Sequence, residues 1–331
     1  MPITEYAALS LLFALALDGL FGEPDWLWRR LPHPIVLMGR LIAVTEQRLN
    51  RANVSAWRRR AHGIMALGGW IAIAVIPGLV LAELSKVFSV LMILEVILVA
   101  ILLAQRSLYE HVNAVRIAFD QTGLAGARHA VSMIVGRNPE TLDAAAVCRA
   151  SIESAAENFS DGVVAPAFWY LVAGLPGILA YKMINTADSM IGHRTPRYEA
   201  FGWASARLDD VANLAPARLC AVFIAIAAPF AGFSGRGAAM SVWCDAGKHR
   251  SPNAGWPEAA MAGALGLALA GPRTYGAETI ADAWMNRTGR QNATPADIAR
   301  ALRLMRVCGI AMAAAVAVLA CILTYAGLFI I

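Results

Sequence analysis

Acidic side chains recur at the helical repeat between residues 149 and 162. Glu153, Glu157 and Asp161 are spaced by four, so they share one face of a helix, and Asn158 adds a neutral oxygen beside them. Like charges at this spacing repel, and a helix tolerates them when a cation such as Mg²⁺ or a basic partner helix lies among them. This pattern indicates a metal or substrate site, with a solvated helix face as the alternative.

The densest group of polar side chains lies between residues 181 and 218. Asn185 and Asp188 are three apart and share a helix face, and Asp209 or Asp210 repeats that geometry with Asn213. The basic residues interleaved with them are Lys182, Arg194, Arg207 and Arg218. Carboxylates for Mg²⁺ beside cations for phosphate oxygens are what phosphoryl transfer requires, because that chemistry depends on positioning and charge neutralisation. The alternative is a network of mutual salt bridges.

A basic loop precedes a predicted helix start at Pro257 and Glu258. Its polar residues are Lys248, His249, Arg250, Ser251 and Asn253. A basic loop that enters a helix N-terminus is a natural anion site. The alternative is a basic loop that flanks a membrane segment.

Two more polar residues lie near the first apolar run. Asp18 stands at the end of that run, where it is either a functional acid at membrane depth or a residue already at the interface. His33 lies between Pro32 and Pro34, which is typical of a rigid loop residue and leaves a substrate contact as the other interpretation.

The elements that must position these residues are apolar helices. Of the 331 residues, 58% are hydrophobic and 15% charged, whereas an ordinary soluble domain is about 45–50% apolar and about 25% charged. This balance excludes a disordered chain, a fibrous repeat and a nucleic-acid-binding module, so we expect no nucleic-acid partner. The apolar runs are 3–20, 62–82, 87–104, 163–183, 217–233 and 307–331. We expect an all-α, polytopic integral membrane protein with about four to six membrane helices in a single domain, 1–331.

Charge asymmetry predicts the sidedness of the loops. The segment 23–61 is rich in Arg, which predicts a cytoplasmic loop. The runs 62–82 and 87–104 would then form a hairpin through an outer turn at Glu83–Lys86. Strict alternation would then place 184–216 outside, where its chemistry would not meet cytoplasmic substrates. We therefore expect 163–183, with its Pro and Gly residues, and 217–233 to be broken or re-entrant, or to line a cavity open to the cytoplasm.

Local signals predict two helix starts and exclude common motifs. Asn138, Pro139 and Glu140 predict a helix that runs to Asp161–Gly162, and Thr294–Pro295 predicts one that continues into the last apolar run. No period-2 strand pattern persists. Five cysteines without a CxxC pair argue against a disulfide or zinc framework. The sequence contains no P-loop and no other common nucleotide motif.

Long stretches of the chain resemble the adenosylcobinamide-phosphate synthase (CobD/CbiB) family of cobalamin biosynthesis. The similar words, in family order, are GEPDWLWRRLPHPIVLMGRLI, RSLYEHV, RASIESAAENFSDGVVAPAFWYLVAGLPGILAYKMINTADSMIGHR, FGWASARLDDVANLAPARL and KHRSPNAGWPEAAMAGALG. The resemblance covers about residues 10–280.

The resemblance implies an ATP-dependent ligation. The family joins (R)-1-aminopropan-2-ol or its O-phosphate to the f propionate of adenosylcobyric acid as an amide. A carboxylate resists attack by an amine, so it must first be activated as an acyl phosphate or similar ester, which requires ATP with Mg²⁺ and cationic clamps. The implied setting is the bacterial inner membrane, in contact with lipid, with other late cobalamin-pathway membrane proteins or a second copy of the chain as further partners.

The polar clusters then take predicted roles. Catalytic candidates are Glu153, Glu157, Asp188, Asp209 and Asp210. Metal ligands are expected among Glu157, Asp161, Asp188, Asp209 and Asp210. Substrate and phosphate contacts are expected from His33, Asn158, Lys182, Asn185, His193, Arg194, Arg207, Asn213, Arg218, Lys248, His249, Arg250, Ser251 and Asn253.

Two other classes of protein remain as alternatives. One is a Mg²⁺-dependent membrane prenyl- or alcohol-phosphotransferase, which carries paired acid motifs on two spans, whereas here the acids are interleaved with Arg, His and Asn. The other is a corrinoid or cobalt transporter or assembly subunit, with Asp18 and Glu95 as intramembrane pathway residues.

Overall fold

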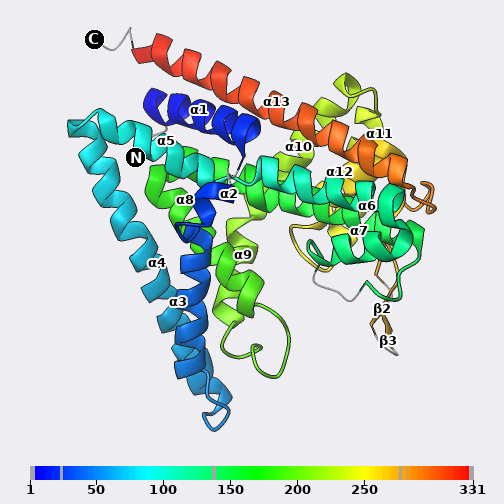
Figure 1. Ribbon diagram of the computed structural model, residues 1–331, viewed down its shortest axis with the longest axis horizontal. Coiled ribbons are helices and arrows are strands. Elements are labelled where there is room, and N and C mark those ends of the chain that lie inside the picture. Colours follow the sequence, from blue (N-terminus) through cyan, green and yellow to red (C-terminus); the bar gives the residue numbers. More distant parts are fainter. Residues whose placement is uncertain (1–3, 23–24, 136–138, 276–277, 281, 328–331) are drawn as a thin grey trace. The chain divides into compact units, whose positions relative to one another are not determined.

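The computed structural model describes residues 4–22, 25–135, 139–275, 278–280 and 282–327, and these residues are almost entirely helical (Figure 1). The chain divides into two compact units. The first contains residues 1–103, 165–213 and 316–331, and the second contains 104–164 and 214–315. The expected helical fold class is confirmed.

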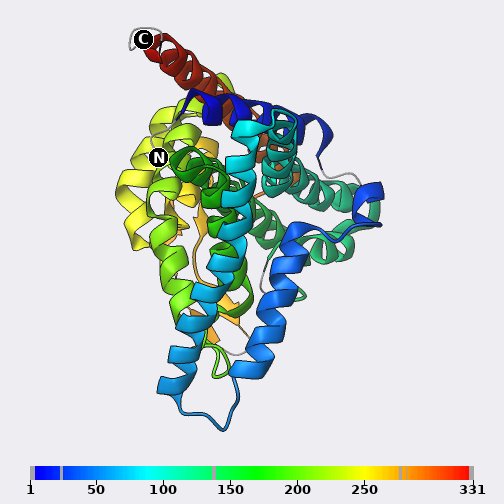
Figure 2. The same ribbon diagram turned by 90° about the vertical axis from the view of Figure 1, so that its left-hand side faces the viewer.

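The first unit is a bundle of apolar helices. Its helices are α1 (Glu5–Phe21), α2 (Asp25–Trp28), α3 (Pro34–Leu49), α4 (Ala56–Val87), α5 (Val90–Leu102), α8 (Ala165–Ile191), α9 (Trp203–Ala212) and the C-terminal part of α13 (Pro295–Gly327). Helix α4 packs along α8, α1 packs on α5, and α9 packs on α8. Figure 2 shows α3 and α4 side by side as far as their connection at residues 50–55.

Helix α8 is broken in the middle, as its glycine and proline content predicts. Gly174 has a φ of 65°, a left-handed conformation that glycine adopts without strain, and Pro176 follows at once. Gly78 of α4 packs against this break, because a Cβ at that position would lie 3.2 Å from the Cα of Pro176. The predicted interruption of 163–183 is therefore confirmed.

The second unit combines helices with two small antiparallel sheets. Its helices are α6 (Gln105–Ser132), α7 (Ala144–Phe159), the π-helical turn η1 (Ser160–Val164), α10 (Leu214–Phe230), α11 (Gly235–Asp245), η2 (Ala246–Lys248), α12 (Gly255–Leu265) and the N-terminal part of α13. Strand β1 (Leu269–Ala270) pairs with β4 (Trp284–Met285), and β2 (Arg273–Tyr275) pairs with β3 (Glu278–Ile280). Each strand has two or three residues, too few for a period-2 pattern to be visible in the sequence.

Two of the expected boundaries are wrong. The turn after α4 lies at Phe88–Ser89 rather than Glu83–Lys86, because the helix continues to Val87. Helix α7 begins at Ala144, where the Asp143 carboxylate accepts a hydrogen bond from Ala146 N at 2.7 Å and caps the helix. The predicted start at Pro139 is displaced by that cap, and Asn138 lies outside the described residues.

Two further predictions about helices have mixed outcomes. The helix that begins at Pro295 does run unbroken into the last apolar segment, to Gly327. For 217–233, the chain is interrupted at Asn213, upstream of the predicted run, and Pro229 lies in the last turn of α10. Proline has no N–H to donate one turn back, and α10 ends at Phe230, one residue after Pro229.

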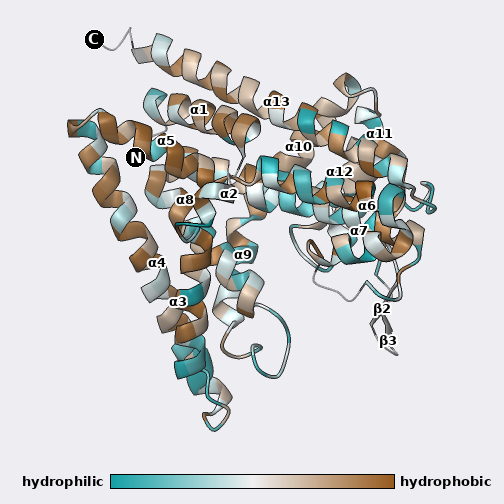
Figure 3. Ribbon diagram, viewed as in Figure 1, coloured by the Kyte–Doolittle hydropathy of each residue, from teal (hydrophilic) through white to brown (hydrophobic). Residues whose placement is uncertain are grey.

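Four helical stretches are long and apolar enough to cross a membrane. They are Ala56–Val87, Val90–Ser132, Ala144–Ile191 and Pro295–Ala326, and the broken pair α9 and α10 brings the number to five. Large apolar side chains such as Ile73, Ile76 and Val80 stand exposed along α4, and Figure 3 shows the same helix largely in the hydrophobic colour. Exposed apolar surface on this scale fits lipid as the surroundings. The chain is a multi-pass membrane protein.

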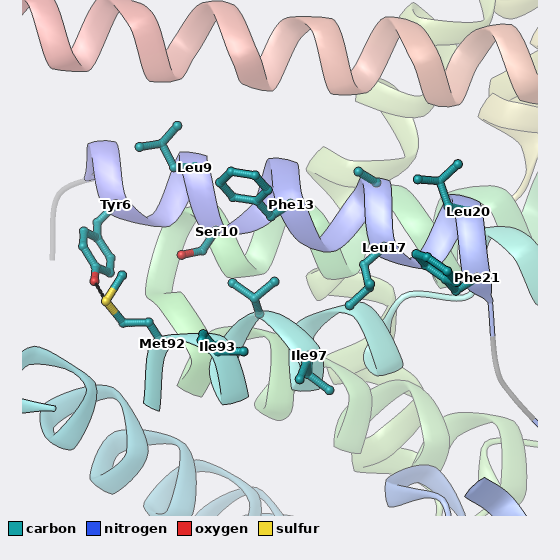
Figure 4. Close-up of a pocket in the computed structure, with 12 residues that line it drawn as sticks. Tyr6, Leu9, Ser10, Phe13, Leu17, Leu20, Phe21, Met92, Ile93 and Ile97 are labelled. Atoms are coloured by element: carbon teal, nitrogen blue, oxygen red, sulfur yellow. Dashed lines mark hydrogen bonds between the residues drawn. The ribbon is translucent and has the colours of Figure 1, made fainter. Parts of the chain in front are cut away.

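An apolar groove of about 690 Å³ lies between α1 and α5 in the first unit. Figure 4 shows Phe13, Leu17 and Ile97 among the side chains that form it, with the Tyr6 hydroxyl in contact with the Met92 sulfur at one end. Ser10 supplies a polar side chain in an otherwise nearly apolar lining. The groove contains none of the predicted site residues.

A hydrogen-bonded clamp joins the loop 192–202 to the connection between α3 and α4. The Arg197 guanidinium donates to both carboxylate oxygens of Glu46, from Nε at 3.0 Å and Nη2 at 2.7 Å. Asn50 donates to Glu46 at 2.7 Å and to the Arg197 carbonyl at 2.9 Å. Arg59 donates to Asn50 Oδ1 at 2.6 Å and to the Pro196 carbonyl at 3.2 Å. The loop and the connection between α3 and α4 therefore lie at the same end of the first unit.

The clamp makes the first unit sensitive to acid. Burial alone would raise the pKa of Glu46, but the hydrogen bonds from Arg197 and Asn50, with the charges of Arg197 and Arg59, outweigh it and hold the pKa below its ordinary value. A lowered folded-state pKa stabilises the fold at pH values above the unfolded pKa. That stabilisation disappears as the pH falls through the folded value.

Replacing Glu46 by Gln should weaken the clamp and remove its pH dependence. We expect E46Q to lose about 2 kcal/mol of stability at pH 7, because a buried hydrogen bond to a charged group is replaced by a neutral one. Its thermal midpoint should fall less than that of the parent between about pH 5 and pH 3. The matched control is Glu83→Gln, whose carboxylate is 61% exposed and paired only with Lys86. Parallel decline of E46Q and the parent protein would contradict the clamp.

The shared side of the clamp can be tested by cysteine labelling. Thr195 is an exposed residue of the loop, and the native exposed cysteines Cys244 and Cys321 would be replaced by Ser. We expect T195C to react with a membrane-impermeant maleimide only from the cytoplasmic side, in parallel with N53C in the α3–α4 connection. S89C in the turn after α4 should react from the other side. Labelling of T195C from the same side as S89C, and not from the side of N53C, would contradict a shared side for the loop 192–202 and the α3–α4 connection.

Candidate functional site

Asp209 on α9 is the centre of the polar cluster in the first unit. Its Oδ1 accepts a hydrogen bond from Asn185 Nδ2 at 3.2 Å, and its Oδ2 accepts from Asn213 Nδ2 at 3.0 Å. Asp209 is only 8% exposed and Asn213 only 1%. The structure thus brings together one residue of α8, one of α9 and the residue that follows α9. Helical spacing predicts the pairing of Asp209 with Asn213, whereas the contact with Asn185 joins two helices.

The structure separates the two adjacent aspartates that the sequence left as alternatives. Asn213 pairs with Asp209, one turn earlier, whereas Asp210 points to Arg207, whose Nη1 lies 3.5 Å from its Oδ2. Arg194 also lies close enough to act on Asp210 electrostatically. Neighbouring residues on a helix point about 100° apart, so one of them is enclosed and the other is half-exposed beside cations.

The charge balance around Asp209 differs from that of other buried acids. Glu46 has Arg197 as its partner, and Asp297 in the second unit has Arg290 and Arg300, each at 2.7 to 2.8 Å. Among the described residues, Asp209 makes no ion pair. Its hydrogen-bond partners are neutral amides, and the charge with the largest effect on it is that of the Asp188 carboxylate. Carboxylates that act on each other in this way are suited to a cationic ligand.

The other basic candidates of the first unit differ in exposure. Lys182 is buried on α8, while His193, Arg194 and Arg207 are exposed. Arg194 and Arg207 act on Asp210, and exposed guanidinium groups can contact the phosphates or carboxylates of a ligand. These residues therefore remain candidates for substrate binding.

The His33 side chain makes contacts within its own loop and helix start. Its Nδ1 accepts a hydrogen bond from Ile35 N at 3.1 Å and so caps α3, and its ring meets Trp28 edge-on with 4.5 Å between centroids. These contacts agree with the interpretation of His33 as a rigid loop residue. Its predicted contact with substrate stays a prediction.

The acids of α7, in the second unit, do not share one environment. Glu153 is buried and its Oε1 accepts a hydrogen bond from Ala270 N at 2.9 Å, whereas Glu157, one turn later, is exposed. Asp161 lies in the π-helical turn η1, where the wider helix shifts the register of side chains. The expectation that all three fall on one α-helical face is therefore wrong. Asn158, also exposed, donates to the Ser154 carbonyl at 2.9 Å.

The basic loop before α12 is held by its own acids. Lys248 lies 2.8 Å from Asp245, Arg250 lies 3.0 Å from Asp282, and His249 lies 3.8 Å from Glu258. These pairs occupy three basic side chains of the loop, and the anion site and the membrane-flanking loop both stay predictions.

Backbone contacts shape the same loop. Ser251 N donates to His249 Nδ1 at 3.0 Å, and Ser251 Oγ accepts from Asn253 N at 3.2 Å. Arg218 stacks over the Trp256 ring at 4.2 Å. These contacts fold the loop tightly at the start of α12, which begins at Gly255 as the Pro257–Glu258 signal indicates.

The fit of a magnesium ion can be judged from the donors. No group of three His, Cys, Asp or Glu side chains in the described part of the chain is placed to hold a metal ion. Mg²⁺ in phosphoryl-transfer sites commonly uses one or two carboxylates and completes its shell with phosphate oxygens and water. Asp188 and Asp209 fit that requirement. A site in which the protein alone supplies the metal ligands does not fit the residues that the structure describes.

Sequence reasoning identified the residues of the Asp209 cluster but missed those that hold it. Tyr181 OH donates to Asn213 Oδ1 at 2.9 Å, and Trp169 Nε1 donates to the Ala212 carbonyl at 3.1 Å. An aromatic residue within an apolar run carries no signal of such a role, because most aromatic residues there only pack.

The fold and the polar cluster define a class, a helical multi-pass membrane protein with an acidic, amide-lined site. Comparison with known sequences gives the family. The model of the CobD/Cbib protein family matches residues 11–305, which include every predicted site residue. The chain belongs to this family, and it acts in cobalamin biosynthesis.

Curated relatives align over nearly the full length. The cobalamin biosynthesis protein CobD of Rhizobium meliloti is 55% identical over 297 residues, covering 89% of this chain and 91% of the relative. That of Sinorhizobium fredii is 54% identical over 314 residues, or 94% and 96% of the two chains. That of Brucella suis is 52% identical over 305 residues, or 91% and 93%. No solved structure matches the chain.

Proposed function

We propose that this protein is an ATP-dependent ligase that joins (R)-1-aminopropan-2-ol, or its O-phosphate, to the f propionate of adenosylcobyric acid. The observation that carries the proposal is the buried Asp209 carboxylate, held by two amides beside Asp188 in a member of the CobD/CbiB family. The amine substrate carries an ammonium group, and ATP binds together with Mg²⁺. Each of these cations would be attracted to the two carboxylates.

The chemistry divides into activation and amide formation. In the first step an oxygen of the propionate carboxylate attacks the terminal phosphorus of ATP, and ADP leaves. In the second step the amine nitrogen attacks the acyl carbon, the bond from that carbon to the phosphate oxygen breaks, and inorganic phosphate leaves. The nitrogen loses a proton in the process, so a nearby carboxylate is required as the base.

The residues of the first unit suit both steps. Asp188 and Asp209 would hold the magnesium ion, which neutralises phosphate charge when bound. Arg194 and Arg207 are exposed beside Asp210 and would contact phosphate oxygens. The clamp supports a cytoplasmic position for the loop 192–202, because it joins that loop to the Arg-rich segment. Positive-inside topology assigns that segment to the cytoplasm, where ATP is available.

The second unit offers a separate set of candidates. Glu157 is exposed on α7, and Arg218 and the loop 248–253 are basic. We propose that this unit contributes contacts to the corrinoid carboxylates or the phosphate group of the amine. Glu153 is the weaker candidate for a base, since one of its oxygens already accepts a backbone hydrogen bond.

The setting that we propose is the bacterial inner membrane, where the exposed apolar helices contact lipid. Family membership supports the ligase over a membrane phosphotransferase or a transporter. Glu95, one of the acids that a transporter would use, accepts a hydrogen bond from Tyr170 OH at 2.7 Å. That contact satisfies an acid in an apolar helix without a transport role.

The proposal can be tested with purified protein in detergent or nanodiscs. Adenosylcobyric acid, ATP, Mg²⁺ and aminopropanol phosphate should yield a corrinoid with the mass of the amide, together with one ADP per amide formed. Asp209→Asn should reduce kcat/KM roughly 100-fold, as expected for a charge that acts on the transition state. Chelation of Mg²⁺ should abolish turnover.

Asp120→Asn is the matched control for D209N. Its side chain is 73% exposed and lies 3.8 Å from Arg116 on the same helix, so the same chemical change should leave turnover intact. The ligase assignment fails when neither the amide nor ADP forms with any combination of the free and phosphorylated amine. Equal activity of D209N and D120N would instead remove Asp209 from the site.

A further inference from the structure

Tyr181 and Trp169 hold the end of α9 from both sides of the break in α8. Trp169 lies before Gly174 and donates to the Ala212 carbonyl, while Tyr181 lies after it and donates to Asn213 Oδ1. Twelve residues of a straight helix would separate the two aromatic residues by about 18 Å. Ala212 and Asn213 are adjacent, so the break in α8 is what allows both contacts.

The contact from Tyr181 determines how the Asn213 amide is used. Asn213 donates from its NH₂ group to Asp209, so its carbonyl oxygen faces away from that carboxyl group and must find a donor elsewhere. The Tyr181 hydroxyl is that donor, at 2.9 Å. Tyr181 and Asn213 are each only 1% exposed, so water cannot easily replace either partner.

We propose that Tyr181 is a positioning residue, whose hydroxyl fixes the Asn213 amide and through it the orientation of the Asp209 carboxylate. The three side chains form one chain of hydrogen bonds, from Tyr181 OH to Asn213 Oδ1 and from Asn213 Nδ2 to Asp209 Oδ2 at 3.0 Å. With Asn185 on the other oxygen, the carboxylate is held at both ends. Its remaining lone pairs are thereby aimed in a fixed direction.

The catalytic part of this inference rests on the proposed ligase function. A carboxylate that reorients must be immobilised again in each turnover, which lowers kcat and leaves the binding of the amine nearly unchanged. Loss of one such hydrogen bond corresponds to a roughly 3- to 10-fold change in rate.

A double-mutant cycle between Tyr181→Phe and Asp209→Asn tests the inference. We expect Y181F to reduce kcat roughly 3- to 10-fold in the parent protein, with less than about a 2-fold change in KM for the amine. In the D209N background the same change should alter kcat less than about 2-fold, because its effect acts through the carboxylate.

Tyr170→Phe is the matched control, made in both backgrounds. Tyr170 lies on the same helix, is also 1% exposed, and its hydroxyl bonds to Glu95 at 2.7 Å instead of to the Asp209 cluster. Y170F should change kcat by the same factor in the parent protein and in the D209N background. Equal losses from Y181F in the two backgrounds would overturn the positioning role.

Thermal midpoints of the same variants separate this inference from the ligase proposal. The hydrogen-bonded chain predicts non-additive shifts for Y181F with D209N and additive shifts for Y170F with D209N. This readout needs no substrate, so it stands even when the parent protein forms no amide. Additive shifts for Y181F with D209N would overturn the inference whether or not the ligase assay succeeds.

Discussion

A carboxylate enclosed in an apolar scaffold requires hydrogen-bond donors around it. In this protein, the type of donor distinguishes the acids that stabilise the fold from the acid that is suited to chemistry. Glu46 and Asp297 are neutralised by Arg side chains, and they join segments that are distant in sequence or fix a helix start. In the part of the chain that the structure describes, the hydrogen bonds to Asp209 come from two neutral amides, and the Asp188 and Asp210 carboxylates act on its charge. We propose that the positive charge for an acid solvated by dipoles in this way comes from a ligand.

The broken helix α8 supplies the geometry for that arrangement. A straight membrane helix would present Asn185 and Asp188 on one side and leave the end of α9 out of reach of Trp169. The turn at Gly174 lets residues on both sides of the break contact the end of α9. Interrupted helices in membranes are tolerated where the break is buried in protein or lines a water-filled cavity, and here the interruption serves the polar cluster.

Composition was enough to predict the apolar runs and, through glycine and proline, the interruption in α8. Helical spacing predicted the grouping of Asn213 with an aspartate. The choice between Asp209 and Asp210 depends on the rotation of α9, which adjacent positions in a sequence do not reveal. The clamp between Glu46 and Arg197 joins residues 151 positions apart, and no local pattern encodes such a pair. The shift of Asp161 out of register arises from a π-helical turn, whose cause lies in packing and not in periodicity.

The most direct measurement is a structure of the full-length protein in nanodiscs with adenosylcobyric acid, Mg²⁺ and a non-hydrolysable ATP analogue. The account predicts the terminal phosphates of the nucleotide within reach of Asp188 and Asp209, with a magnesium ion between them and the Asn213 amide still on the Asp209 carboxylate. Nucleotide bound away from α8 and α9, with Asp209 enclosed by its two amides as before, would contradict it.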